Sequence, residues 1–376
     1  GEEGEGGGGN SPLTSLSMAQ TQQTLSFFRP GFWPLQPRDF VGSPVSTPLF
    51  IVGFFRSGST LLESLLGVHE GVRTMGEHSP FTFRMYDLQS DLIDAVSREE
   101  GEDLDEIYLH RLRGPLAKHA DLLLREMQEH FTQSDAYRNI TGETFPFTAK
   151  PPASTENAQR IVDKMLLNFR NIALIHLMFP HAVILHTVRD PLDTLLSCLS
   201  NRFGDQSSCS LDIPDMVLDY VLYLETIHHF HSVLPRLRYP LYTPPGQSPR
   251  VIERSALVDV RYEELVANPA KVMRRLFDII GIQMPALDKL QRFHDSGRPV
   301  HTASFLQVKK PLYASSVGKW RKYAQGMKDT VIRELEKHLP TLRRKRALPY
   351  EHDGRSPMNW GLDQDFDYME HLRRLV

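Results

Sequence analysis

One stretch near the N-terminus constrains the fold more than any other, LFIVGFFRSGSTLLESLL at residues 49–66. Its first part is an apolar run rich in Ile and Val, which is typical of a strand buried in a parallel sheet. After the loop, leucines recur at helical spacing. The sequence therefore predicts a strand over Pro48–Val52, a glycine-bounded loop over Gly53–Thr60 and a helix over Thr60–Leu66.

Strand-like and helix-like patterns alternate along the rest of the chain. HAVILHTV at 181–188 and VDVRY at 258–262 read as strands, while 192–199 and 269–280 read as helices and Pro214 caps a long one. Such alternation predicts an α/β fold, in which a mostly parallel, P-loop-type sheet is flanked by helices in a single domain. We expect this domain over residues 47–330, after a disordered or extended tail at 1–46 and before a helical or irregular extension at 331–376.

Two further segments have a helical pattern. Residues 87–133 have a helical, charged pattern, and residues 104–131 within them predict two helices with a break near Gly114 and Pro115. Residues 157–178 predict a helix that contains the run VDKMLLNF, with a short strand over VDKM as the alternative.

Composition excludes some classes of function. A net charge of −3 over 376 residues provides no basic field for nucleic acid, so any anion must be bound locally. The two cysteines, Cys198 and Cys209, are expected to be free thiols rather than one bridge. We expect no metal, because His228, His229 and His231 lack the spacing of a zinc pair on a helix.

The sequence leaves the compartment open. No apolar run approaches the roughly 20 residues that span a bilayer, and no signal peptide is visible. The chain begins with Gly1 rather than Met, so an upstream anchor is not excluded. A Golgi lumen is expected if such an anchor exists, and the cytoplasm otherwise.

The loop after the first strand has the chemistry of an anion cradle. Gly53 and Gly58 have the spacing of a nucleotide-binding P-loop, but Ser59 replaces its lysine. Backbone N–H groups at a helix N-terminus attract anions, and Arg56 adds a planar cation. These features favour a loop that binds a phosphate-like group rather than a magnesium-bound nucleotide triphosphate. The alternative is a plain tight turn that binds no ligand.

The second predicted strand ends in Arg189-Asp190-Pro191. Ligands of α/β sheets bind beyond the carboxyl ends of the strands, so this arginine is expected to face a ligand crevice. Ser197 lies two helical turns further on and is expected to face the same place. The alternative is a surface arginine paired with Asp190 or Asp193.

Four segments in order resemble the sulfotransferase family. They are FIVGFFRSGSTLLESLL, VDKMLLNF, VILHTVRDPLDTLLS and TASFLQVKKPLYASSVGKWRKY, and the resemblance covers about residues 47–327. Within that family, the chain resembles the branch with tyrosylprotein sulfotransferases and the bacterial sulfotransferases fused to tetratricopeptide repeats. Four motifs in the family's order are far more specific than any one of them.

The resemblance implies a co-substrate, 3′-phosphoadenosine 5′-phosphosulfate (PAPS). By similarity, its 5′-phosphosulfate is held by Arg56, Ser57, Gly58, Ser59 and Thr60. Its 3′-phosphate is held by Arg189, Ser197 and Lys319, and Tyr262 lies near the nucleotide. Protein-tyrosine members carry a basic residue where this chain has Asn201, and Arg202 is one step away.

The resemblance also implies catalytic residues. Glu77 matches the family's base, with the neighbouring His78 as a competitor whose ordinary pKa suits proton transfer better. Lys164 and Arg56 stabilise charge as the nucleotide leaves, and Ser304 hydrogen-bonds the transferring group. Judged by residue type alone, Glu77 could instead cap a helix and Lys164 could lie on the surface.

The acceptor is a hydroxyl-bearing molecule: a protein tyrosine, a carbohydrate, or a small alcohol or phenol. Family members that bind acidic tyrosine peptides use arginines after the base, where this chain offers Arg73 and Arg84 and has Pro80 instead of the usual pattern. Two other classes stay open, a P-loop kinase and a non-catalytic nucleotide-binding protein. The assembly is also open, with a homodimer as one option.

Overall fold

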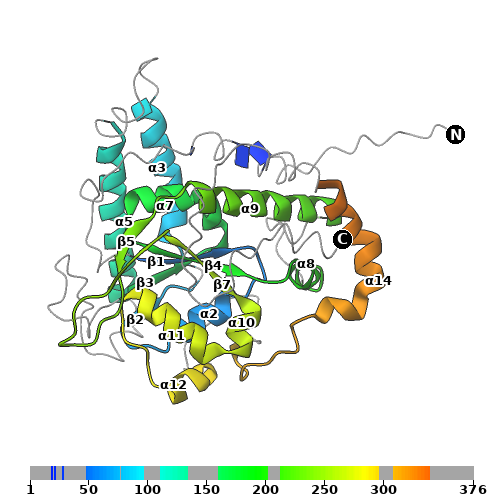
Figure 1. The fold of residues 1–376 in the computed structure, drawn as a ribbon. Helices are drawn as coiled ribbons and strands as arrows, with labels where there is room; N and C mark the ends of the chain where they lie inside the picture. The colour runs from blue at the N-terminus through cyan, green and yellow to red at the C-terminus, as the bar shows by residue number, and fades with distance from the viewer. Residues whose placement is uncertain are drawn as a thin grey trace. The chain divides into compact units, whose positions relative to one another are not determined.

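The computed structural model describes residues 18–19, 21–22, 28, 48–76, 78–96, 111–133, 160–201, 212–295 and 308–338 (Figure 1). Contacts group the chain into two compact units, each built from separate segments. The first takes residues 190–228 and the segment from 315 onward, together with residues before 26. The second takes residues 26–189 and 229–314 and contains the central sheet.

The central sheet has five strands in the order β2-β3-β1-β4-β7. Every pairing between neighbours is parallel. The strands are β1 (Leu49–Gly53), β2 (Val72–Thr74), β3 (Arg160–Lys164), β4 (Val183–Val188) and β7 (Leu257–Arg261). All residues of β1, β3 and β4 are buried, as expected for parallel strands covered on both faces. The predicted parallel sheet flanked by helices is therefore confirmed.

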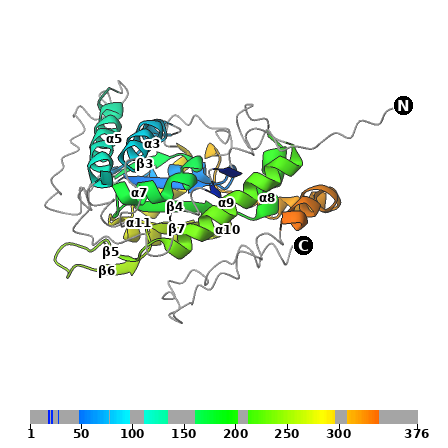
Figure 2. The ribbon, with the colours of Figure 1, turned by 90° about the horizontal axis from the view of Figure 1, so that it is seen from above.

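Helices cover both faces of this sheet. In Figure 1, α7 (Ile172–Met178) lies over one face, and α2 (Ser59–Leu66), α10 (Tyr262–Ala267) and α11 (Pro269–Ile280) lie over the other. Both views show α3 (Pro80–Val96) beside α5 (Arg113–Gln133) (Figure 2). The second unit also contains the antiparallel pair β5 (Leu237–Pro240) and β6 (Val251–Arg254), and the short helix α12 (Leu287–Gln291).

The first unit is helical where it is described. It contains α8 (Pro191–Leu199), most of α9 (Ile213–Val233), a 3₁₀ helix at Lys319–Tyr323, α14 (Ala324–Met327) and a π-helical turn at Lys328–Ile332. Helix α8 begins one residue before the predicted Leu192. The side chain of Asp190 caps it by accepting hydrogen bonds from the N–H groups of Leu192 and Asp193.

Helix α11 has the predicted bounds, but the prediction for residues 157–178 is wrong. This segment contains strand β3, then a 3₁₀ helix at Leu166–Asn171 and then α7, so the alternative strand over VDKM is the correct one. The cause is tertiary: β3 lies between β1 and β2, and pairing on both sides fixes an extended backbone.

The predicted break at Gly114 and Pro115 is also wrong, because α5 runs through both residues. Pro115 stands in the first turn of the helix, where its missing N–H has no helical partner to lose. Strands β2, β5 and β6 have only three or four residues each and were not predicted from the sequence.

The expectation of free thiols is wrong for Cys198, which is disulfide-bonded in α8. The chain has one other cysteine, Cys209, which lies outside the described residues. Among the helices that the structure describes, none is long and apolar enough to cross a membrane. The domain boundaries near residues 46 and 330 stay predictions.

Candidate active site

The loop between β1 and α2 has the backbone of a tight anion cradle. Gly58 precedes the first turn of α2 with a left-handed φ of 98°. Arg56 also has a positive φ of 67°, which is uncommon for a residue with a side chain and is typical of functional loops. The first turn of α2 contains no acidic side chain, so the positive end of the helix dipole is not neutralised within the helix.

The ring of Tyr262 packs against this loop at Gly58. A Cβ atom built on Gly58 would lie 2.5 Å from Cδ2 of Tyr262, so only glycine fits between the loop backbone and the ring. Tyr262 is the first residue of α10, directly after β7. The carboxyl ends of β1 and β7 therefore hold the loop and the tyrosine together, although about 200 residues separate them in sequence.

Arg189 joins the same group from the end of β4. Its Nη1 donates a 3.0 Å hydrogen bond to the carbonyl oxygen of Arg56, and its guanidinium lies 4.8 Å from the ring centre of Tyr262. Only 9% of Arg189 is exposed. The alternative of a surface arginine is therefore wrong, and Arg189 lies where the sequence placed it, at a strand end beside the loop.

Two cations are thus buried near one another. Burial lowers the pKa of the Arg56 guanidinium, and the charge of Arg189 lowers it further, while Tyr313 and Tyr262 act in the opposite direction. Like charges in a poorly hydrated place repel one another. An anion at this loop would relieve that repulsion, which is an electrostatic reason to expect one.

The hydroxyl of Ser57 has a structural contact. Its Oγ lies 2.6 Å from Oγ1 of Thr187, and Thr187 donates to the carbonyl oxygen of Val52. These bonds tether the loop to β1 and β4. Ser59 and Thr60 are buried in the first turn of α2, where their backbone N–H groups belong to the helix N-terminus.

Lys164 is buried at the end of β3 with only 3% exposure, so it is not the surface lysine of the alternative. Its Nζ lies 3.7 Å from Oε2 of Glu63, which is a buried residue of α2. The other carboxylate oxygen of Glu63 accepts a 3.0 Å hydrogen bond from the N–H of Gly76. One carboxylate therefore links Lys164 to the backbone immediately before Glu77.

Glu63 was not predicted from the sequence. It stands among leucines in an amphipathic helix, and nothing in that spacing shows that it meets a strand about 100 residues further along. Glu77 itself lies outside the described residues, as does Ser304.

A second buried network anchors the chain just after Glu77. Asp163 in β3 has no exposed surface, and Ser79 donates to its two oxygens at 2.9 and 2.8 Å. Asn168 adds a longer bond of 3.4 Å. Burial raises the pKa of the Asp163 carboxyl to about 7, although the bonds from Ser79 and from the N–H of Phe81 favour its charged form.

His78, the alternative base, is exposed and stacks on a second imidazole. Its ring centre lies 4.6 Å from that of His130 in α5, with an angle of 14° between the planes. Burial lowers the pKa of His130, and the nearby His78 lowers it further. The imidazole of His78 is thus in contact with the α3–α5 pair.

The basic residues considered for acidic peptides have other contacts. Arg84 forms a salt bridge with Glu126 across the α3–α5 pair, and its Nε donates to that carboxylate at 2.9 Å. Arg73 donates from Nη1 to the carbonyl oxygen of Glu70. Both cations are therefore engaged within the fold.

Two predicted ligands of the 3′-phosphate, Ser197 and Lys319, belong to the first unit. Within that unit, the carboxylate of Asp193 accepts hydrogen bonds from the N–H groups of Gly318 and Trp320, at 2.6 and 2.9 Å. These bonds hold the turn that carries Lys319 against the helix that carries Ser197. The segments that carry the two residues are thus brought together from positions more than 100 residues apart.

Residues 48–286 match the sulfotransferase family, and the chain belongs to that family. This match runs through both compact units, in agreement with the expectation of one sulfotransferase domain. A protein of Aquifex aeolicus (strain VF5), described as uncharacterized, is 29% identical over 288 residues. The aligned region is 75% of this chain but only 31% of that relative.

Solved structures that match the chain include two sulfotransferase domains and one sulfotransferase. The sulfotransferase domain of the Synechococcus PCC 7002 olefin synthase is 18% identical, with a TM-score of 0.39 and coverage of 76% of this chain and 90% of that one. The domain from the curacin biosynthetic pathway is 17% identical, with a TM-score of 0.39 and coverage of 73% and 90%. STF9 of Mycobacterium avium is 15% identical, with a TM-score of 0.33 and coverage of 85% and 86%.

The contact between Gly58 and Tyr262 predicts the result of a glycine substitution. Gly58→Ala should destabilise the protein more than Gly246→Ala, by about 1–3 kcal/mol. Both glycines have a positive φ, so both substitutions carry a similar backbone strain, but nothing lies within 4 Å of a Cβ at Gly246. Chemical denaturation measures the difference. Equal losses of unfolding free energy would contradict the packing of Tyr262 on the loop.

The raised pKa of Asp163 predicts a pH dependence. The folded protein holds this proton up to about pH 7, whereas the unfolded chain releases it near the ordinary value of 3.8. Stability from this group is therefore complete below pH 3.8 and is lost as the pH rises to about 7. The difference in unfolding free energy between wild type and Asp163→Asn should fall over that interval by on the order of 4 kcal/mol at most.

Urea denaturation between pH 4 and pH 8 measures this difference. Asp121→Asn, which removes a carboxyl group at an exposed position of α5, is the matched control. If the difference in unfolding free energy between wild type and Asp163→Asn did not change with pH, Asp163 would be charged in the folded protein over the whole range from pH 4 to pH 8.

Proposed function

We propose that this protein transfers a sulfuryl group from PAPS to the hydroxyl group of an acceptor. One observation carries the proposal: the loop before α2, Arg189 and Tyr262 meet at the carboxyl edge of a parallel sheet in a chain of the sulfotransferase family. This edge is where α/β proteins bind their ligands.

The residues of the loop fit a phosphosulfate. Backbone N–H groups at the start of α2 suit its oxygens, and glycine at position 58 allows the close approach of the backbone. Arg56 supplies a cation beside them. A second phosphate, at the 3′ position, would be bound by Arg189 with Ser197 and Lys319. Tyr262 would flank the nucleotide, since its ring already stacks on the guanidinium of Arg189.

In the proposed reaction, Glu77 removes the proton from the acceptor hydroxyl. Lys164 and Arg56 stabilise the negative charge that develops on the bridging oxygen as the nucleotide leaves. The bridge from Lys164 through Glu63 to the N–H of Gly76 supports this arrangement, because it holds the chain next to Glu77 close to the lysine. The stacking of His78 on His130 favours Glu77 over its neighbour as the base. Ser304 is assigned to the transferring group by family similarity alone.

The acceptor class is a matter for experiment. Protein tyrosine, carbohydrate and small phenol or alcohol each provide the hydroxyl that the reaction needs. Because Arg84 pairs with Glu126, it is a poor ligand for an acidic peptide, and this weighs against the tyrosine assignment. A screen with radiolabelled PAPS and acidic tyrosine peptides, glycans and phenols tests the proposal. No transfer to any of them, together with magnesium-dependent turnover of ATP, would favour the kinase alternative.

Donor affinity should depend on Arg189. Arg189→Ala should weaken binding of adenosine 3′,5′-bisphosphate by about 10- to 100-fold, since a hydrogen bond to a charged group contributes about 1.5–3 kcal/mol. Arg189→Lys should lie between wild type and alanine because it keeps the charge and loses the planar fork. Calorimetric titration measures the affinities, and Arg238→Ala, at an exposed position of β5, is the control. Normal affinity of Arg189→Ala would remove this residue from the donor site.

The base can be identified by substituting two neighbours. Glu77→Ala should lower turnover by about 10²- to 10⁴-fold and leave affinity for the bisphosphate nearly unchanged, because a positioned base acts on the acceptor. His78→Ala should retain most activity. Phenols of low pKa should partly rescue Glu77→Ala, since they ionise with less help, but should not rescue Lys164→Ala, which lacks the cation at the leaving oxygen. An inactive His78→Ala beside an active Glu77→Ala would move the base to the histidine.

A further inference from the structure

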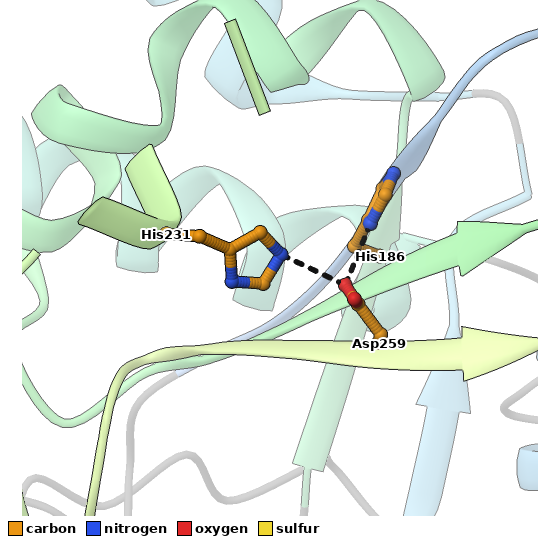
Figure 3. A group of neighbouring side chains, drawn as sticks. All are labelled: His186, His231 and Asp259. Carbon is orange, nitrogen blue, oxygen red and sulfur yellow. Dashed lines mark hydrogen bonds and ion pairs between the residues drawn. The ribbon is translucent and has the colours of Figure 1, made fainter. Parts of the chain in front are cut away.

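Three side chains from three different elements converge on one point of the second unit (Figure 3). His186 belongs to β4, Asp259 to β7 and His231 to the last turn of α9. Nδ1 of His186 lies 2.8 Å from Oδ1 of Asp259, and Nε2 of His231 lies 3.0 Å from the same oxygen. The three candidate ligand atoms all lie within 4.8 Å of one another.

The sheet holds two of these residues in place. His186 and Asp259 are direct partners in the parallel register of β4 and β7, so their side chains project from the same face of the sheet. His186 is fully buried, whereas the side chains of Asp259 and His231 are 28% and 34% exposed. The cluster is therefore buried at His186 and partly exposed to solvent at Asp259 and His231.

The donor set suits a divalent transition metal. Two imidazole nitrogens and one carboxylate oxygen, with a further position open to water, form a known coordination pattern for Zn²⁺. Ligand atoms about 2.0–2.2 Å from a tetrahedral zinc ion lie roughly 3.4 Å from one another. The observed separations of 2.8 and 3.0 Å from Oδ1 would have to widen by about 0.5 Å to admit the ion. The two nitrogens, which lie within 4.8 Å of each other, would also have to come to about 3.4 Å. Each coordinating nitrogen would then carry a lone pair, with the proton on the other ring nitrogen.

We propose that His186, His231 and Asp259 bind one Zn²⁺ ion through Nδ1, Nε2 and a carboxylate oxygen. The ion would tie the end of α9 to two adjacent strands of the sheet. Arg189 follows His186 by three residues, and Tyr262 follows Asp259 by three. The ion would thus brace the two strands whose ends carry proposed donor-binding residues, and it has no part in the transfer step.

One cation faces this cluster from the neighbouring helix α11. Arg275 interacts electrostatically with the carboxylates of Glu264 and Asp259. A guanidinium near the carboxylate competes with a metal ion for the same negative charge. Arg275→Gln should therefore tighten zinc binding, a change that a purely hydrogen-bonded cluster does not produce.

The test uses the full chain, stripped with EDTA and then dialysed against Zn²⁺. Wild type should retain one equivalent of zinc by elemental analysis, and its unfolding temperature should rise on adding the ion. His231→Ala should weaken affinity by at least about 100-fold, because loss of a ligand exceeds the loss of an outer-shell partner. Asp259→Asn keeps the shape of the side chain and should also abolish retention. Co²⁺ in place of zinc should give visible absorption bands in wild type but not in His231→Ala or Asp259→Asn.

His228→Ala is the matched control, since it removes an exposed histidine from the same helix, and it should bind zinc as wild type does. Circular dichroism in EDTA establishes that each variant is folded. The proposal is overturned if wild type retains no stoichiometric zinc. It is also overturned if His231→Ala and Asp259→Asn bind as tightly as His228→Ala, which would leave a hydrogen-bonded bridge between strands.

Discussion

Parallel pairing of all five strands is the constraint on which the candidate site depends. In a parallel sheet every carboxyl end lies at the same edge, so whatever follows β1, β3, β4 and β7 is gathered there. The loop before α2 follows β1, Lys164 ends β3, Arg189 follows β4 and Tyr262 follows β7. The candidate site is thus made from residues at four strand ends.

Gathering these residues at one edge concentrates positive charge in a poorly hydrated place. Arg56 lies in the loop, Arg189 hydrogen-bonds to it from the end of β4, and Lys164 is buried at the end of β3 with Glu63 as its partner. Within the fold, Glu63 pairs with the lysine, and the two arginines lie at the loop where the proposed donor would bind.

Because side chains alternate along β3, its last two residues, Asp163 and Lys164, contact different parts of the fold. Lys164 points to the side of α2 and meets Glu63, whereas Asp163 points the other way and binds Ser79 at the start of α3. Together they fix the chain on either side of Glu77, through Gly76 on one side and Ser79 on the other. Two adjacent strand residues therefore hold the described chain on both sides of position 77.

The sequence alone determined the elements with strong local signals. The apolar run, the glycines and the leucines of residues 49–66 specify strand, loop and helix through short-range sterics and periodicity, and α11 follows from its amphipathic pattern and Pro269. The positions of Arg189 and Tyr262 at strand ends also followed from the sequence, because strand ends are local features.

Only the tertiary structure decided the rest. Residues 160–164 form a strand despite their helical pattern because β1 and β2 pair with them. Pro115 does not break α5 because the helix begins at Arg113, which places the proline in the first turn. The role of Glu63 and the meeting of His186, His231 and Asp259 rest on contacts between segments far apart in the chain. The periodicity of apolar residues predicts which face of a helix or strand is buried. It does not predict which distant segment packs against that face, because that depends on the tertiary fold.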